Sequence, residues 1–140
     1  MEIDCIYCSK DKNLKELMSE ICKLEGSILY LFRDQKHLGR CVLAYKYHAT
    51  ELFEIPRYNY EIYMKELKFV ANKLKELFNC DKVNYAVYGD LINHVHFHIV
   101  PKYKDGIQWG EPFSDKINPK FLKDEEFEKI KNLILKKVTN

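Results

Sequence analysis

A row of alternating histidines stands in the second half of the chain. Residues 94–98 read His-Val-His-Phe-His, and Ile-Val-Pro follows. Because alternate side chains of a β-strand point to opposite faces, His94, His96 and His98 share one face and the apolar residues between them enter a core. A neutral imidazole can attack phosphorus, exchange a proton or bind a metal. The row therefore predicts a strand with catalytic or metal-binding chemistry, and a polar strand face that is merely rich in histidine is the alternative.

A second chemical pattern is the pair Cys5-Ile6-Tyr7-Cys8 near the N-terminus. Such a pair is compatible with a zinc half-site, a redox pair or coincidence. A structural zinc needs four ligands, commonly two thiolates and two imidazoles, so two ligands would come from far along the chain. Outside the row, the histidines are His37 and His48. The other three cysteines stand in apolar surroundings and are interpreted as core residues: Cys22, Cys41 and Cys80.

A third zone, ahead of the histidine row, is suited to an anion. It consists of Asn84 and the segment 89–93, which reads Gly-Asp-Leu-Ile-Asn. Glycine allows a ligand to approach the backbone closely, and asparagine can donate hydrogen bonds to phosphate oxygens. Turn formation explains Gly89 and Asp90 equally well.

Length and composition predict one domain spanning residues 1–140 with a real hydrophobic core. Hydrophobic residues make up 46% of the 140, and the formal net charge is only +2, which argues against stable nucleic-acid binding through phosphates. No apolar run approaches the ~20 residues of a membrane span. Residues 1–4 lack the apolar region of a secretory signal, and five cysteines is an odd number. We therefore expect a cytoplasmic protein with reduced or metal-bound thiols.

Apolar periodicity and turn residues predict the elements that position these groups. We expect an early helix from Leu14 to Leu24 that ends at Gly26, a long amphipathic helix over 58–78 and a C-terminal helix over 124–138. Four strands are expected at 27–32, 40–46, 83–88 and 95–100, the first two joined by a polar turn. The segment 103–119 is expected to be a loop. This arrangement predicts an antiparallel α+β fold.

Residues 94–100 resemble the signature of the histidine-triad (HIT) family, His-φ-His-φ-His-φ-φ, in which φ is apolar. Further similarity lies in Gly89 before the motif, in Pro-Lys-Tyr at 101–103 and in the hairpin that contains Asp34 and Gly39-Arg40. The pair Cys5-x-x-Cys8 is similar to that of zinc-bearing bacterial members. The resemblance covers about residues 3 to 110.

The resemblance implies an α+β fold with a five-stranded antiparallel sheet, in a homodimer whose sheets join. It also implies a nucleotide hydrolase or nucleotidyl transferase that acts on a nucleoside phosphoramidate or a dinucleoside polyphosphate. By position, His96 would be the nucleophile that attacks the α-phosphorus, and His98 would bind the phosphate or leaving-group region. A nucleotide-binding set would assist them: Phe32 near the base, Asp34 at the ribose, Asn84 at a phosphate oxygen, and Asp90 or Asn93 near the leaving group.

In zinc-bearing members a structural zinc takes the cysteine pair, a histidine after the second strand and the first histidine of the triad. Here these are Cys5, Cys8, His48 and His94, which leaves His37 for an exposed turn. Two departures stand out: Leu91 replaces a common serine or threonine, and Arg40 replaces a histidine that supports the triad. Two alternatives stay open, namely a nucleotide-binding or scaffold protein without catalysis and a metallohydrolase with its catalytic metal on the histidine row.

Overall fold

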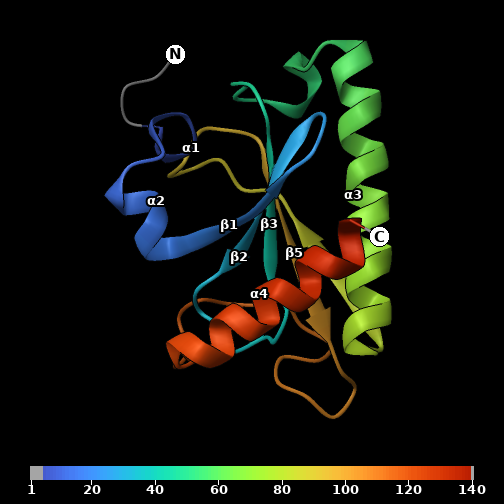
Figure 1. Cartoon of the computed structure of the whole chain (residues 1–140). Coiled ribbons are helices and arrows are strands. Elements are labelled where there is room, and N and C mark those ends of the chain that lie inside the picture. The colour runs from blue at the N-terminus through green and yellow to red at the C-terminus, as the bar shows by residue number, and fades with distance from the viewer. Residues whose placement is uncertain (1–4, 140) are drawn as a thin grey trace.

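The computed structural model describes residues 5–139, so the predicted 1–140 domain extends at both ends into residues outside the described range. Figure 1 shows the elements in order. They are α1 (Ile6–Ser9), α2 (Lys12–Leu17), β1 (Met18–Lys23), β2 (Ser27–Phe32), β3 (Cys41–Tyr45), a 3₁₀ helix η1 (Leu52–Glu54), α3 (Arg57–Phe78), β4 (Lys82–Ala86), β5 (His96–Lys102) and α4 (Asp124–Thr139).

The strands form one five-stranded sheet in the order β1-β2-β3-β5-β4, and every neighbouring pair is antiparallel. The predicted α+β fold with five antiparallel strands, a long helix and a C-terminal helix is therefore confirmed. Strand β5, which carries the histidine row, lies between β3 and β4. Side chains of the first hairpin and of the strand before the row can therefore lie beside the histidines.

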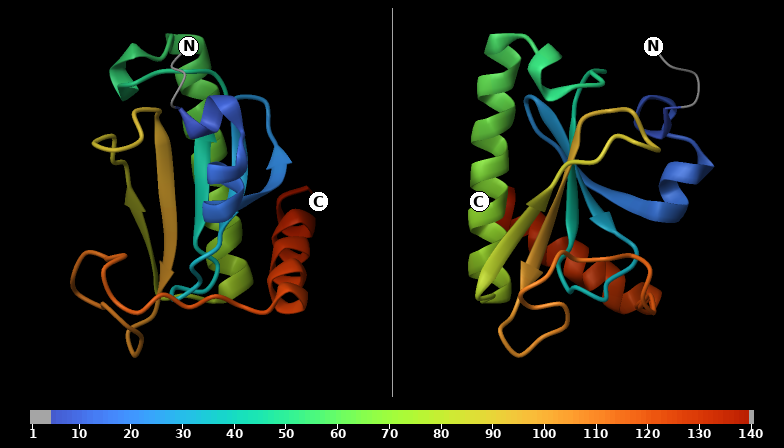
Figure 2. Two further views of the ribbon diagram at one scale, coloured as in Figure 1. Left: turned by 90° about the vertical axis from the view of Figure 1, so that its left-hand side faces the viewer. Right: turned by 180° about the vertical axis from the view of Figure 1, so that it is seen from behind.

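Both faces of the sheet are covered. Helices α3 and α4 lie against one face, and the N-terminal segment with α1 and α2 lies beside the other (Figure 2). Val95, Phe97 and Ile99 enter the α3–α4 core as expected. The histidines share the opposite face with Val42 and Ala44, which pack against Tyr7 and Leu14. Burial on both faces explains why β3 is buried along its whole length.

The predicted early helix from Leu14 to Leu24 is wrong in its second half. Helix α2 ends at Leu17, and Met18–Lys23 pairs with β2 as an edge strand. Residues three apart on a strand face opposite sides, and here Met18 packs in the α1–α2 core while Ile21 packs in the α3–α4 core. Since both faces are buried, a helix-like apolar spacing arises in a strand. A bulge between Glu20 and Cys22 adds to the irregular pattern.

The turn between β2 and β3 is buried rather than exposed. Gly39 has φ +88°, and a Cβ there would lie 2.5 Å from the Phe78 ring, so the turn requires glycine. The prediction that His37 is exposed is wrong, because it is 5% exposed and its Nε2 lies 2.7 Å from Gln108 Oε1. The loop 103–121 covers this turn and buries its polar groups.

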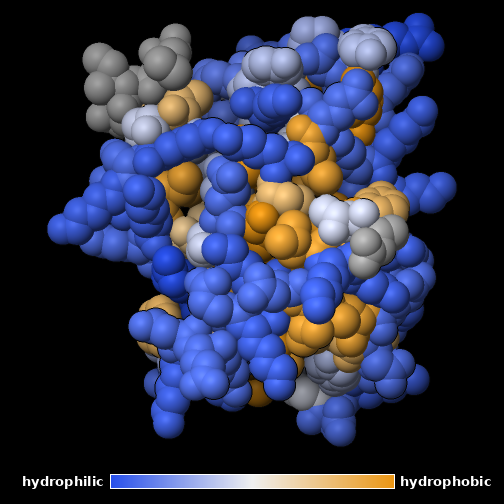
Figure 3. Space-filling view, in the orientation of Figure 1, coloured by the Kyte–Doolittle hydropathy of each residue, from blue (hydrophilic) through white to orange (hydrophobic). Residues whose placement is uncertain are grey.

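Two lysine side chains hold the loop 103–121 against the sheet and the β2–β3 turn. Lys102 Nζ donates to the carbonyls of Gln108 and Glu111, and Lys36 Nζ donates to those of Ser114 and Ile117. The predicted loop at 103–119 is confirmed, since it contains turns but no helix or strand. In the view of Figure 3, polar residues cover most of the surface and apolar side chains gather in the middle. No helix among residues 5–139 is long and apolar enough to cross a membrane.

Candidate active site and metal centre

The histidine row forms the floor of the site because strand alternation and the neighbouring strands agree. His96 lies opposite Ala44 and His98 opposite Val42, so the rings stand on small and medium-sized neighbours of the same face. The Tyr7 ring, from the segment between the two cysteines, lies 5.1 Å from the His94 ring and 5.0 Å from the His96 ring. One aromatic side chain therefore covers two of the three histidines.

Cys5, Cys8, His48 and His94 come together at one end of the row. One potential ligand atom from each lies within 4.8 Å of the others. Among them, Cys5 Sγ–His94 Nδ1 is 3.3 Å, Cys8 Sγ–His48 Nδ1 is 3.3 Å and the two Nδ1 atoms are 3.1 Å apart. A tetrahedral zinc with ordinary bond lengths would separate its ligand atoms by about 3.3–3.8 Å. The donor set and its spacing thus fit a structural metal, and the predicted group of four is brought together.

The partner of its other ring nitrogen prepares His94 for this task. His94 Nε2 lies 2.8 Å from the Tyr45 carbonyl oxygen, which can only accept, so Nε2 carries the proton. The lone pair then resides on Nδ1, the atom that faces the thiols. Burial lowers the pKa of His94 to about 4. A neutral imidazole held by a carbonyl is the usual state of a metal-binding histidine.

His96 has the opposite tautomer. Its Nδ1 lies 2.6 Å from the carbonyl oxygen of His94, so Nδ1 carries the proton and donates to that oxygen. The unprotonated nitrogen is therefore Nε2, whose lone pair is available for attack. Burial lowers the pKa of His96, although the hydrogen bond to the His94 carbonyl opposes this effect. The ring is consequently neutral at pH 7.

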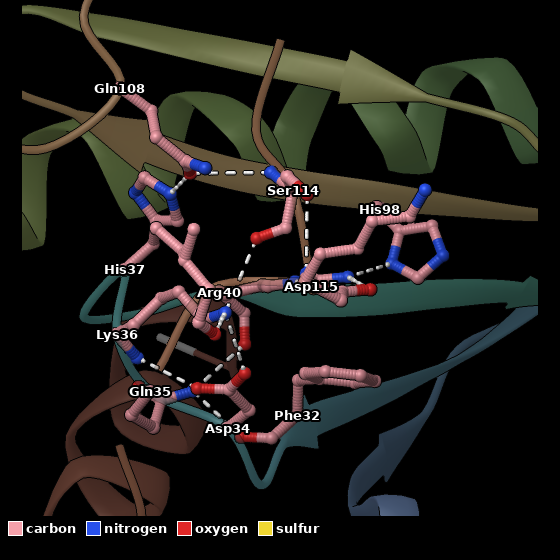
Figure 4. A network of polar contacts seen from close by, with 12 residues as sticks. Phe32, Asp34, Gln35, Lys36, His37, Arg40, His98, Gln108, Ser114 and Asp115 are labelled. Atoms are coloured by element: carbon pink, nitrogen blue, oxygen red, sulfur yellow. Dashed lines mark hydrogen bonds and ion pairs between the residues drawn. The ribbon is translucent and has the colours of Figure 1, made fainter. Parts of the chain in front are cut away.

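His98 contacts a buried arginine at the other end of the row. Arg40 Nη2 lies 3.1 Å from His98 Nδ1, and Arg40 also binds Asp115 from the loop 103–121 (Figure 4). Arg40 belongs to the alternation that places Val42 and Ala44 on the histidine face. Burial, followed by the Arg40 charge, lowers the pKa of His98 to about 3.

Aromatic side chains surround His98. Phe32, Tyr88 and Phe113 have ring centroids 6.0, 6.1 and 6.1 Å from the His98 ring. Phe32 was predicted as a base contact. Sequence reasoning missed Tyr7, Tyr88, Phe113 and Asp115. Tyr7 lies between the cysteines and could have been noticed, whereas Phe113 and Asp115 lie in a loop without a pattern.

The other predicted nucleotide-binding residues lie at varying distance from the row. Asn84 lies on the same face of the sheet, where it pairs with Val100, two residues along β5 from His98. Asp34 Oδ1 accepts from the backbone N–H groups of Lys36 and Lys120, and its other oxygen lies 3.3 Å from Lys36 Nζ. Asp90 is exposed and, with Asn93, lines a cleft beside His94. The structure groups Phe32 most closely with the histidines.

This combination of fold and histidine row has a counterpart among known families. A family model described as HIT domain matches residues 21–105, so the chain belongs to the HIT domain family. A HIT-like protein of Methanocaldococcus jannaschii is 30% identical over 114 residues, covering 76% of this chain and 88% of that protein. An adenosine 5'-monophosphoramidase of Saccharomyces cerevisiae is 28% identical over 117 residues, covering 80% and 72%.

Solved structures show the same fold at lower identity. A histidine triad protein from Bradyrhizobium japonicum has a TM-score of 0.84 at 24% identity, covering 91% of this chain and 96% of that one. A Zn-bound histidine triad family protein from Mycobacterium smegmatis has a TM-score of 0.68 at 18% identity, with 97% and 94% covered. The chain thus adopts the fold of this family over most of its length.

Proposed function

We propose that this protein is a nucleotide hydrolase or nucleotidyl transferase that cleaves at the α-phosphate of a nucleoside phosphoramidate or dinucleoside polyphosphate. The observation that carries the proposal is the tautomer of His96, whose Nδ1–H is committed to the His94 carbonyl and whose Nε2 lone pair is free to attack. The similarity to the yeast phosphoramidase supports the choice of substrate class.

In the first step, His96 Nε2 attacks the α-phosphorus and forms an N–P bond while the bond from phosphorus to the leaving group breaks. A leaving phosphate takes the bonding pair alone. A leaving amine takes the bonding pair and a proton from water, and the hydroxide that remains is neutralised by the proton released in the second step. The ring gains positive charge, and the His94 carbonyl stabilises it because that oxygen accepts from Nδ1–H. In the second step water attacks phosphorus, the N–P bond breaks, and its electron pair returns to Nε2. A nucleoside monophosphate and a proton are released.

The remaining side chains would bind the nucleotide. His98 would hold a phosphate oxygen, Phe32 would contact the base, and Asp34 the ribose. Asn84 and Asp90 would contact phosphate or leaving-group oxygens. The aromatic rings around His98 support a base or ribose nearby, since they offer apolar area beside a polar group. For Asp34, ribose binding would compete with its present hydrogen bonds to Lys36 and Lys120.

Zinc is the metal that we propose for Cys5, Cys8, His48 and His94, in a cytoplasmic protein with reduced thiols. Two thiolates and two imidazoles suit zinc, and the four ligand atoms lie close together. The metal would be structural, because four protein ligands leave no position for water. It would fix the N-terminal segment, and so Tyr7, over His94 and His96.

The proposal includes a homodimer whose sheets join and a single domain over 1–140. Strand β4 is an edge of the sheet, and beside it α3 and β4 form an apolar groove that includes Met64, Phe69 and Tyr85. An exposed edge with apolar neighbours is a natural place for a second copy to add its strand.

Replacing the nucleophile tests the reaction. We expect His96→Ala to lower kcat by at least about 10³-fold, because the covalent route is lost. Intact mass after rapid quenching, with adenosine phosphoramidate or diadenosine polyphosphates as substrates, should show a nucleotidyl adduct on the wild type and none on the variant. Metal content and the melting temperature should change little.

A control for the loss of a buried histidine outside the row is His37→Ala, which should still form the nucleotidyl adduct. Near-wild-type turnover by His96→Ala would refute the assignment of the nucleophile. Tight binding of AMP without any adduct on the wild type would favour the nucleotide-binding protein without catalysis.

A further inference from the structure

We propose that Arg40 and Asp115 form a positioning pair that fixes His98 in the Nε2–H tautomer, so that His98 presents a hydrogen-bond donor to the substrate. The inference rests on the proposed function for the direction in which His98 acts, but its geometric part stands on the contacts of the two side chains.

The guanidinium of Arg40 has little freedom. Arg40 is 1% exposed, and its guanidinium carbon lies 4.1 Å from the centre of the Phe32 ring and 4.9 Å from that of Phe113. Two aromatic rings thus hold the planar group by cation–π contact. A lysine ammonium could not reproduce this planar packing.

Asp115 supplies the compensating charge. Arg40 Nη1 lies 2.5 Å from Asp115 Oδ1, and Nη2 lies 3.4 Å from Oδ2. Although partial burial raises the pKa of Asp115, the hydrogen bond and charge of Arg40 bring it below its ordinary value. A buried arginine without a carboxylate would be costly. The ion pair explains how a buried cation is tolerated on the histidine face of the sheet.

The arginine dictates the proton position on His98. A guanidinium only donates hydrogen bonds, so His98 Nδ1, 3.1 Å from Nη2, has to accept. A neutral imidazole with Nδ1 unprotonated carries its proton on Nε2. In Figure 4 the second ring nitrogen of His98 points away from Arg40. The donor that a phosphate oxygen would meet is therefore chosen by a residue on the far side of the ring.

The loop that carries Asp115 is itself fixed. Its neighbour Ser114 is held through its carbonyl by Lys36 and through its N–H by the side-chain oxygen of Gln108. Asp115 is therefore placed over Arg40 by contacts on the adjacent residue. The competing hypothesis is that Arg40 releases Asp115 and binds the substrate phosphate directly.

The test compares Arg40→Met, which has no donor, with Arg40→Gln, which keeps a donor without the charge. Long-range ¹H–¹⁵N spectra of the imidazole rings in the full-length protein report which nitrogen of His98 is protonated. We expect a single Nε2–H form in the wild type, a mixture or the Nδ1–H form in Arg40→Met, and at least partial return to Nε2–H in Arg40→Gln. With adenosine phosphoramidate, kcat should fall about 10- to 100-fold in Arg40→Met, with KM nearly unchanged.

Controls keep the inference separable from the reaction. Arg57→Met removes an arginine that pairs with Glu61 on the surface and should change neither readout. If Arg40→Met fails to fold, Asp115→Asn replaces it, with a smaller loss of the Nε2–H form expected. An unchanged His98 tautomer in every folded variant, or a rise in KM with kcat intact, would overturn the positioning role. Absence of any adduct on wild-type His96 would instead overturn the proposed reaction and leave the tautomer measurement standing.

Discussion

The two ends of the histidine row use the same side chain in different ways. At one end, His94 Nε2–H donates a hydrogen bond to the Tyr45 carbonyl, and Nδ1 faces two thiols and a second histidine. At the other end, His98 accepts a hydrogen bond from Arg40 at Nδ1. The partner of one ring nitrogen decides what the other can do. The role that each histidine can take thus depends on the hydrogen-bond partner on the protein side of its ring.

The middle histidine depends on the first. His96 donates to the backbone carbonyl of His94, and Tyr7 covers both rings. A metal at the cysteine cluster would therefore stabilise the position of the nucleophile without touching the substrate. At the His98 end, the polar contacts come instead from the hairpin and the loop 103–121. The following variants test this division between the two ends.

The largest effect is expected at the metal end. Cys5→Ser should abolish zinc binding and lower the free energy of unfolding by about 4 kcal/mol, if free zinc stands about 1000-fold above the dissociation constant. Metal analysis and denaturant unfolding measure the two quantities. Cys80→Ser, at a buried cysteine outside the cluster, should keep its metal. If Cys5→Ser retained zinc, the four-residue zinc site would be refuted, and the alternative of a catalytic metal on the histidine row would be favoured.

A smaller effect is expected at the residue that joins the metal end to the nucleophile. Tyr7→Leu should cost about 1–3 kcal/mol of unfolding free energy, because a buried ring in the α1–α2 core is lost. It should also weaken zinc binding and reduce kcat together. Phe127→Leu, at a buried ring of the α3–α4 core, is the control for packing alone. Equal effects of both variants on metal affinity and kcat would mean that Tyr7 does not join the two sites.

The smallest effect within any one pH unit is expected at the His98 end, because it develops gradually as the pH changes. The pKa of His98 is about 3 in the folded protein, against about 6.5 in the unfolded chain, so the unfolded state binds the extra proton between these values. Stability from this residue is complete above pH 6.5 and is lost as the pH falls toward 3. Urea unfolding of His98→Asn should show a shallower loss, by up to about 1.4 kcal/mol per pH unit. Wild-type and variant curves that run parallel would contradict this assignment.

Much of the fold could be predicted from local pattern. The alternation in residues 94–100 determined which side chains enter the core, and apolar spacing determined α3 and α4. The same reasoning failed for β1, because a helix-like spacing also suits a strand that is buried on both faces. The turn at His37 was misjudged for a related reason, since the loop that buries it comes 71 residues later.

The sequence by itself determined that three imidazoles share a face and that two thiols stand near the N-terminus, because these follow from alternation and short spacing. Only the tertiary structure decided which ring nitrogen of each histidine is protonated. The groups that fix these protons are the carbonyls of Tyr45 and His94 and the guanidinium of Arg40. Arg40 in turn depends on Asp115, 75 residues away in a loop without a periodic pattern. A proton's position depends on neighbours brought together by folding, which local periodicity does not encode.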